Sequence, residues 1–361
     1  MKTRTLEASS LALSTAALGR TFKDESLVYE SARLYCWGLS ELQRTLSSPR
    51  LAFDDETLAA CLTLSMYEMM ECPAEGTHAY ASHCKGLLAL IQGRGPHAHV
   101  SGLGHQLFLA TRLIGILYTM QQHSPTYLAD PIWMKVPFSQ SSKRPIDRVA
   151  DCLAQAPTIF NKTDRIQELH PMEQLELANN LASQCWDLDW TMQQCYEELR
   201  LTVDGPLYWS ELSRSGSPLD EADQKRLFPV AYKFPNIKIA STLMMYWATL
   251  VMLWSGLSDL YRLIDSIVND EAATEHQELD LPPLGHRSDF LPMAWHVCRS
   301  VDYCMQEEMM TVGSLAVASP LALVIGTLRD NPHCQQEVLW MRAALGQVQG
   351  RGLRIFEHVR L

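Results

Sequence analysis

The chain has no C-x-x-C pair, although its 361 residues include ten cysteines. Most of the cysteines lie in apolar helical patterns, where a free thiol acts as a small hydrophobic group, and this argues against a disulfide framework and a cysteine-only zinc cluster. We therefore expect free thiols in a reducing compartment. The motifs G-x-G-x-x-G, G-x-x-x-x-G-K-[ST] and G-x-S-x-G are missing as well, which excludes the common nucleotide-binding loops and the nucleophile elbow of α/β-hydrolases.

Positive charge is also scarce. Lys and Arg together number 30 against 41 Asp and Glu, so the formal net charge is −11, and no segment is dense in basic residues. The nearest is Lys143-Arg144, which is too short to act as a phosphate-binding face. Because a protein that holds DNA by its phosphates needs such a face, we expect no direct binding to nucleic acid.

Strand signals are few, and apolar residues recur at helical spacing along most of the chain. The pattern predicts an all-α fold, a single large multi-helix bundle or array over residues 1–361 with little or no β-sheet. Three segments rich in Pro, Ser and charge are expected to be loops, the last of them the most mobile: 122–143, 203–222 and 270–287.

Two apolar segments bear on membrane association. The longest uncharged run, Ile239–Trp254, has 16 residues and falls short of the roughly 20 that span a bilayer. It predicts a helix buried on most sides. The N-terminal run resembles a weak signal peptide, but Glu7 interrupts it, so we expect neither secretion nor a membrane anchor.

The stretch CPAEGTHAYASHC, residues 72–84, has the composition of a zinc site. On a helix over 76–92, however, His78 and His83 diverge by about 140° and cannot meet at one ion. Cys72 precedes a proline at the end of the preceding helix. We therefore predict a helix hairpin with a half-buried His83 and no metal. The three histidines of GPHAHVSGLGH, residues 95–105, lack an acidic or cysteine partner nearby and are expected in a mobile polar loop.

Three blocks of sequence occur in the same order as in a known family. DDETLAACLTLSMYEMMEC with GTHAYASHCKGLLALIQGRGP resembles the middle region of fungal-specific transcription factors. FPNIKIASTLMMYWATLVMLWSGL resembles their long apolar helix, and the segments from AWHVCRSVDYCMQEEM to RGLRIFEHV resemble their C-terminal end. The positions that match the first block are Asp55, Glu56, Tyr67, Glu68, His83, Gly86, Arg94, Gly95 and Pro96.

Regulators of this family usually begin with a two-zinc, six-cysteine cluster and a basic linker, and the chain contains neither. Three interpretations stay open: a regulator-like protein that acts through a DNA-binding partner, a shortened form of a regulator, or a duplicated helical scaffold with another use. The resemblance favours the first. It implies a nuclear regulator of a fungal, secondary-metabolic gene set, with a DNA-binding regulator or a second copy as partner, a small effector, and no cofactor.

Aromatic and sulfur side chains on the apolar faces are candidates for lining an effector pocket, although core packing explains the same pattern. These candidates are Tyr67, His83, Tyr246, Trp247, Trp254, Trp295, Tyr303 and Met305. The alternative function is a cytoplasmic, cofactor-free cyclase or isomerase in a fungal biosynthetic pathway. Its acid–base residues would come from His83, His296, Asp302 and Tyr303.

Overall fold

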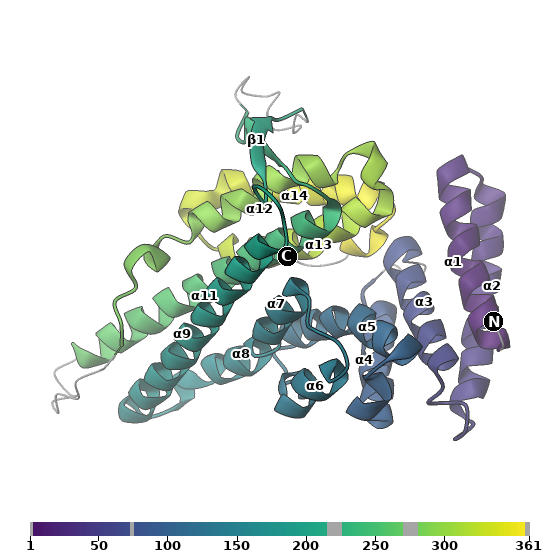
Figure 1. The fold of residues 1–361 in the computed structure, drawn as a ribbon, viewed down its shortest axis with the longest axis horizontal. Coiled ribbons are helices and arrows are strands. Elements are labelled where there is room, and N and C mark those ends of the chain that lie inside the picture. The colour runs from purple at the N-terminus through teal and green to yellow at the C-terminus, as the bar shows by residue number, and fades with distance from the viewer. Residues whose placement is uncertain (1–2, 73–75, 215–225, 270–280, 358–361) are drawn as a thin grey trace. The chain divides into compact units, whose positions relative to one another are not determined.

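Helices build most of the chain, as the sequence predicted (Figure 1). The computed structural model describes residues 3–72, 76–214, 226–269 and 281–357. Within these residues the only sheet is an antiparallel pair, β1 (Trp209–Leu212) with β2 (Val230–Lys233), in which Trp209 lies opposite Lys233. The all-α prediction is therefore confirmed.

Backbone contacts divide the chain into two compact units. The first contains the described parts of Met1–Gln122, Thr126–Lys143 and Gln349–Arg360, and the second contains His123–Pro125 and those of Arg144–Val348. Because compact units can belong to one domain, the single domain expected over 1–361 stays a prediction.

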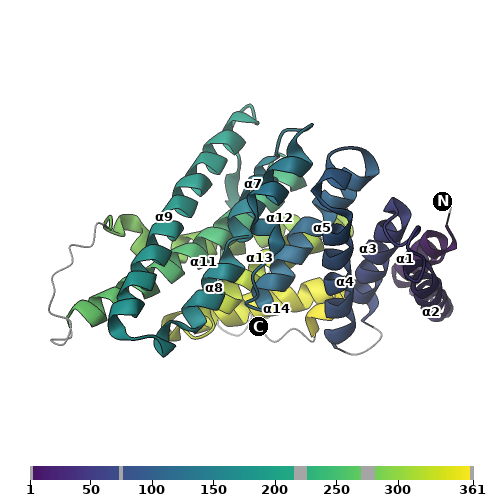
Figure 2. The same cartoon turned by 90° about the horizontal axis from the view of Figure 1, so that it is seen from below.

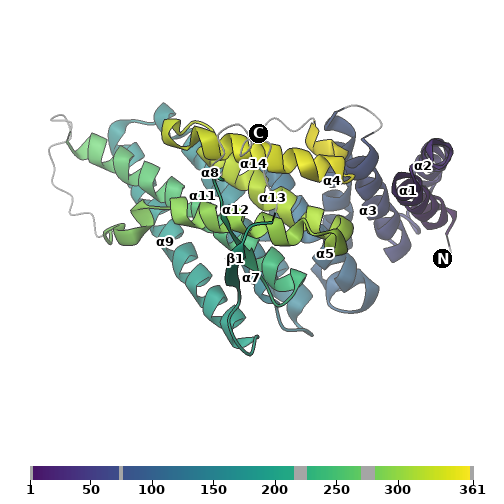
Figure 3. The same ribbon diagram turned by 90° about the horizontal axis from the view of Figure 1, so that it is seen from above.

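The first unit begins with an antiparallel pair of helices, α1 (Arg4–Phe22) and α2 (Glu25–Leu46), which lie side by side in all three views (Figures 1, 2 and 3). The buried side of α1 consists of small residues. A Cβ atom on Gly19 would come within 2.9 Å of the Val28 backbone nitrogen, so this close approach requires glycine. Asp24 starts α2 as its N-cap, where Oδ1 accepts hydrogen bonds from the Ser26 and Leu27 amides at 2.9 and 3.3 Å.

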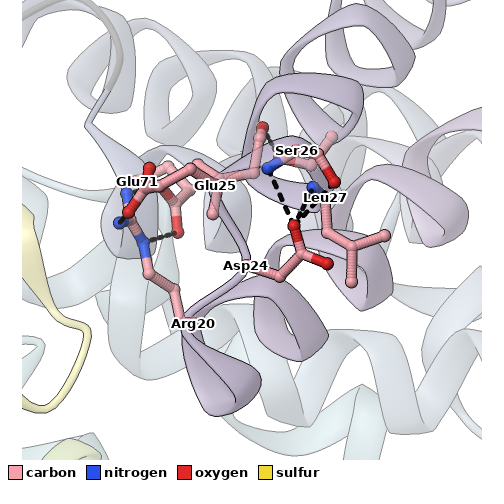
Figure 4. A network of polar contacts seen from close by, with 8 residues as sticks. Arg20, Asp24, Glu25, Ser26, Leu27 and Glu71 are labelled. Carbon is pink, nitrogen blue, oxygen red and sulfur yellow. Dashed lines mark hydrogen bonds and ion pairs between the residues drawn. The ribbon is translucent and has the colours of Figure 1, made fainter.

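A buried ion pair joins α1 to the end of α3 (Asp55–Glu71) (Figure 4). The Arg20 guanidinium donates from Nε and Nη2 to the two carboxylate oxygens of Glu71, at 3.1 and 2.6 Å. This hydrogen bonding raises the pKa of Arg20, although burial opposes the shift. The forked geometry fixes the C-terminal turns of both helices relative to each other.

The first unit continues through two long helices, which the sequence predicted over 76–92 and 101–121, and several short helical turns. They are α4 (His78–Arg94), the 3₁₀ turn η1 (Pro96–His99), α5 (Gly102–Gln121), η2 (Tyr127–Ala129), α6 (Pro131–Lys135), η3 (Val136–Phe138) and, near the C-terminus, η8 (Arg354–Glu357). The prediction of a loop over 122–143 is wrong for residues 127–129 and 131–138. Leu128, Trp133 and Phe138 are buried there, and they hold short helical turns that are too brief to give a periodic pattern.

The second unit is built around the long helix α11 (Ile237–Val268), which contacts α9, α12 and α13 (Figures 2 and 3). The remaining elements of this unit are α7 (Pro145–Leu153), α8 (Ala156–Asp164), η4 (Ile166–Glu168), α9 (Pro171–Leu201), η5 (Gly285–Ser288), α12 (Leu291–Cys304), η6 (Glu307–Met309), α13 (Met310–Leu328), η7 (Pro332–Cys334) and α14 (Gln335–Gly350). Two helical segments are long and apolar enough to cross a membrane by length and composition, Ile237–Val268 and Glu307–Leu328. Their most apolar windows are 78% and 44% buried within the protein, so α11 is the mostly buried helix that its sequence predicts.

The other two predicted loops are partly described. Residues 203–214 include β1, and the rest of 203–222 lies outside the described residues. Of 270–287, only 281–287 are described, and Arg287 is anchored there. Its guanidinium donates from Nε and pairs through Nη2 with the buried Asp189 carboxylate, at 2.8 and 2.6 Å.

Candidate functional site

A cluster around the Tyr35 hydroxyl joins three helices of the first unit. Tyr35 lies on α2 and donates to Oε1 of Glu68 on α3, while Nε2 of His83 on α4 lies 3.3 Å from the same hydroxyl. The Tyr35 ring stacks on Tyr67 with 4.5 Å between centroids, and the Tyr67 hydroxyl lies 3.1 Å from Ser31 Oγ. Two residues predicted from the sequence, Tyr67 and His83, are thus brought into one cluster.

The hydrogen-bond directions in this cluster follow from its carboxylate. Because ionised Glu68 can only accept, Tyr35 donates to it, and the tyrosine oxygen accepts in turn from His83 Nε2–H. Burial raises the pKa values of Glu68 and Tyr35 and lowers that of His83. Glu68 is 1% exposed, and its Oε2 has no hydrogen-bond partner among the described residues. Burial therefore makes the charged form of each group less favourable than it is in water.

The neighbouring histidines correct another prediction. His99 and His105 are buried rather than part of a mobile polar loop, because backbone carbonyls hold their ring nitrogens. His99 Nδ1 lies 3.0 Å from the Gly104 oxygen, and His105 Nδ1 lies 2.9 Å from the His99 oxygen. Across the part of the chain that the structure describes, no three His, Cys, Asp or Glu side chains form a group that could hold a metal ion.

A second cluster, around the Tyr232 hydroxyl, lies in the second unit. Tyr232 on β2 is 2.8 Å from Nδ1 of His296 on α12, and Nη1 of Arg299 donates to the same hydroxyl at 3.2 Å. The His296 ring stacks on Trp247 of α11 with 4.9 Å between centroids. The ring of Tyr208 packs against both Tyr232 and Trp247.

The guanidinium sets the hydrogen-bond directions in this second cluster. Arg299 can only donate, so the Tyr232 oxygen accepts from it, and the tyrosine O–H can then donate to Nδ1 of a neutral His296. Burial, with a smaller effect of the Arg299 charge, lowers the pKa of His296 to about 4. His296 is therefore neutral at pH 7, with its proton on Nε2.

A narrow crevice adjoins the second cluster. It is lined by Ser213, Phe228, Val230, Ala231, Cys298, Arg299, Val301, Asp302, Met305, Trp340, Ala344 and Gln347. Its volume of about 30 Å³ holds one or two water molecules or one small polar group, whereas pockets for whole small molecules measure hundreds of Å³. Asp302 Oδ2 accepts from the Arg214 amide at 2.7 Å and from Ser213 Oγ at 3.3 Å, which fixes the end of β1 to α12.

The remaining predicted pocket residues have separate core contacts. The Tyr246 and Trp295 rings pack on Tyr196 and Phe228, and the Tyr303 ring packs on Phe234. Trp254 instead donates from Nε1 to the buried Asp189 carboxylate at 2.6 Å. The eight candidates therefore do not line one pocket: Trp247 belongs to the second cluster, and Met305 alone of them lines the crevice.

The four acid–base residues of the alternative enzyme function are divided between the two units. His83 belongs to the first unit, and His296, Asp302 and Tyr303 to the second. His296 and Asp302 both lie on α12, but they have different hydrogen-bond partners. Sequence reasoning did not select Tyr35, Tyr232 or Arg299 for a site, and it noted Glu68 only through the family resemblance. The feature that could have led to these sites is a pair of tyrosines, each buried beside a charged group.

Comparison with known proteins adds one partial match. No family model matches the chain, and no solved structure matches it. The chain is similar to the uncharacterized protein AN5342 of Emericella nidulans, with 26% identity over 177 residues. The match covers 46% of this chain and 38% of that protein, so it spans well under two thirds of the relative.

Proposed function

We propose that the chain is a nuclear regulatory protein that controls a fungal metabolic gene set by binding a DNA-binding partner protein. The observation that carries the proposal is an exposed apolar stripe on α1. Leu11, Leu18 and Phe22 are 43%, 50% and 72% exposed. Their spacing of seven and four residues places them on one side of the helix. Contiguous exposed apolar side chains are typical of protein-binding surfaces.

The spacing and the charge of the chain indicate what kind of partner fits. Apolar residues seven and four positions apart suit pairing with an amphipathic helix. The formal net charge of −11 complements the basic character that a DNA-binding protein needs. The partner is therefore a basic, DNA-binding regulator that contacts the α1 stripe through a helix.

The two histidine clusters support a regulatory rather than a catalytic role. Each histidine is hydrogen-bonded to a tyrosine, and each tyrosine is also bound by a charged side chain. These bonds hold helices together. A general base must instead reach a substrate proton, with a pKa near the working pH, and the pKa of His296 is lowered to about 4.

Gene replacement in the native host tests the proposal. After deletion, the strain is complemented with the wild type, with Leu18→Glu/Phe22→Glu, or with a control, Leu201→Glu, whose side chain is 81% exposed at the end of α9. We expect the wild type and the control to restore transcripts of the controlled genes and the stripe variant to fail. Exposed substitutions change stability by about 0.5 kcal/mol at most, so all three proteins should fold.

Two outcomes would contradict the proposal. Full restoration of the transcripts by the stripe variant would show that the α1 stripe is not the surface that binds the partner. Unchanged transcripts in the deletion strain, together with an accumulated metabolic precursor, would favour the cofactor-free enzyme. Sedimentation of the purified wild type at several concentrations separates a third outcome, in which the stripe binds a second copy of the chain.

A further inference from the structure

The Arg299 side chain is a partly buried cation without a carboxylate partner in the described chain. Its recorded contacts are the hydrogen bond to Tyr232 and a position 5.9 Å from the centroid of that ring. Asp302 lies one turn away on α12 but accepts from the Arg214 amide and Ser213 instead. Burial weakens the hydration of this guanidinium, and the Asp302 carboxylate in the same crevice accepts hydrogen bonds from Arg214 and Ser213.

The crevice beside Arg299 offers space for one small charged group. A volume of about 30 Å³ is enough for one or two waters, which is about the size of a carboxylate. Apolar side chains, among them Phe228, Val230 and Trp340, line the same crevice, and the Phe228 and Trp340 rings are 4.7 Å apart between centroids. A ligand with an anionic head and an apolar body therefore matches both parts of the lining.

We propose that this crevice binds a small-molecule monocarboxylate. The carboxylate occupies the volume of about 30 Å³ and accepts hydrogen bonds from the Arg299 guanidinium, and the apolar remainder extends beyond this volume against Phe228 and Trp340. Asp302 lines the same crevice, so its charge repels every anion there, and a dianion such as phosphate more strongly than a monocarboxylate. This site goes beyond the proposed function and does not depend on the α1 stripe, so either proposal can fail while the other stands.

Titration of the full chain with benzoate and with benzamide tests the site. Benzamide has the same shape without the charge. We expect benzoate to bind the wild type and to bind Arg299→Gln at least ten-fold more weakly, because a charge-assisted contact is lost. Arg299→Lys keeps the charge and should retain part of the affinity. The matched control is Arg262→Gln on α11, which removes an exposed arginine paired with Asp259 and should bind like the wild type.

A second measurement keeps the test decisive if Arg299→Gln does not fold. The indole N–H signal of Trp340, assigned with Trp340→Phe, should shift when benzoate is added to the wild type and not when benzamide is added. The proposal is overturned if benzoate leaves this signal unchanged, if benzamide binds as tightly as benzoate, or if Arg299→Gln folds and keeps its benzoate affinity within two-fold.

Discussion

The clusters around Tyr35 and Tyr232 share a histidine–tyrosine hydrogen bond but differ in the charge beside it. In the first cluster a carboxylate, Glu68, accepts from the tyrosine, so His83 must donate. In the second a guanidinium, Arg299, donates to the tyrosine, which leaves the tyrosine O–H able to donate to His296. The histidine–tyrosine hydrogen bond thus has opposite directions in the two units. The third residue, and not the pair, decides whether each histidine donates to the tyrosine or accepts from it.

Removal of the two tyrosine hydroxyls should give the largest difference between the clusters. Tyr35→Phe leaves the buried Glu68 carboxyl without its donor, which should cost about 2–4 kcal/mol of unfolding free energy. Tyr232→Phe leaves a partly exposed arginine and a neutral histidine, which water can reach, so the cost should be about 1 kcal/mol. Urea unfolding at pH 7 measures both. Tyr29→Phe, on the exposed side of α2, is the control with no expected change, and equal losses in the two clusters would contradict the comparison.

The pH dependence of stability should distinguish His296. Its pKa is about 4 in the folded chain and near 6.5 when unfolded, so the unfolded chain binds the proton more readily. The contribution of neutral His296 to the free energy of unfolding is therefore complete above pH 6.5 and is lost as the pH falls toward 4. We expect about 2 kcal/mol, because partial exposure reduces the effect. His296→Gln should remove this part of the slope in urea unfolding at pH 4–7, and an unchanged slope would show that His296 does not titrate in this way.

Glu68→Gln should have a smaller effect of opposite sign. Burial raises the pKa of Glu68 in the folded chain, so its contribution is favourable below the ordinary pKa and declines as the pH rises through the raised value. Glutamine still accepts from Tyr35 but carries no charge. The variant should gain about 1 kcal/mol at pH 8 and nothing at pH 4, in matched unfolding experiments. A loss at pH 8 would mean that the ionised carboxylate stabilises the cluster.

Sequence periodicity predicted the helices that carry these clusters. It predicted little of the contacts between those helices. The pattern that ends before Pro73 corresponds to the end of α3, and it placed Tyr67 and His83 where they are partly or fully buried. Tyr35, however, lies 33 residues from Glu68 and 48 from His83. Contacts at such separations depend on how the helices pack. The hydrophobic pattern along one helix carries no information about that packing.

The second cluster and the segment 122–143 were harder to predict for different reasons. Tyr232 lies on a four-residue strand, 64 residues before His296, and so short an element gives almost no alternation to detect. In 122–143 the order comes from single buried side chains such as Trp133, which anchor turns of three to five residues. The apolar run PIWMKVPF around Trp133 is too short to show a helical period, so the composition of the whole segment suggested a loop.

The Arg20–Glu71 fork has a practical consequence for work with this protein. Glu71 is almost fully buried, and the fork neutralises its carboxylate. A shortened protein that starts at α2 would lose Arg20 and the small residues of α1 together, leaving a buried negative charge at an uncovered apolar seam. Expression vectors for the first unit should therefore encode the chain from before Arg4. A poor yield of shorter versions would indicate that the contact between α1 and α3 has been lost, and not that the fold itself is unstable.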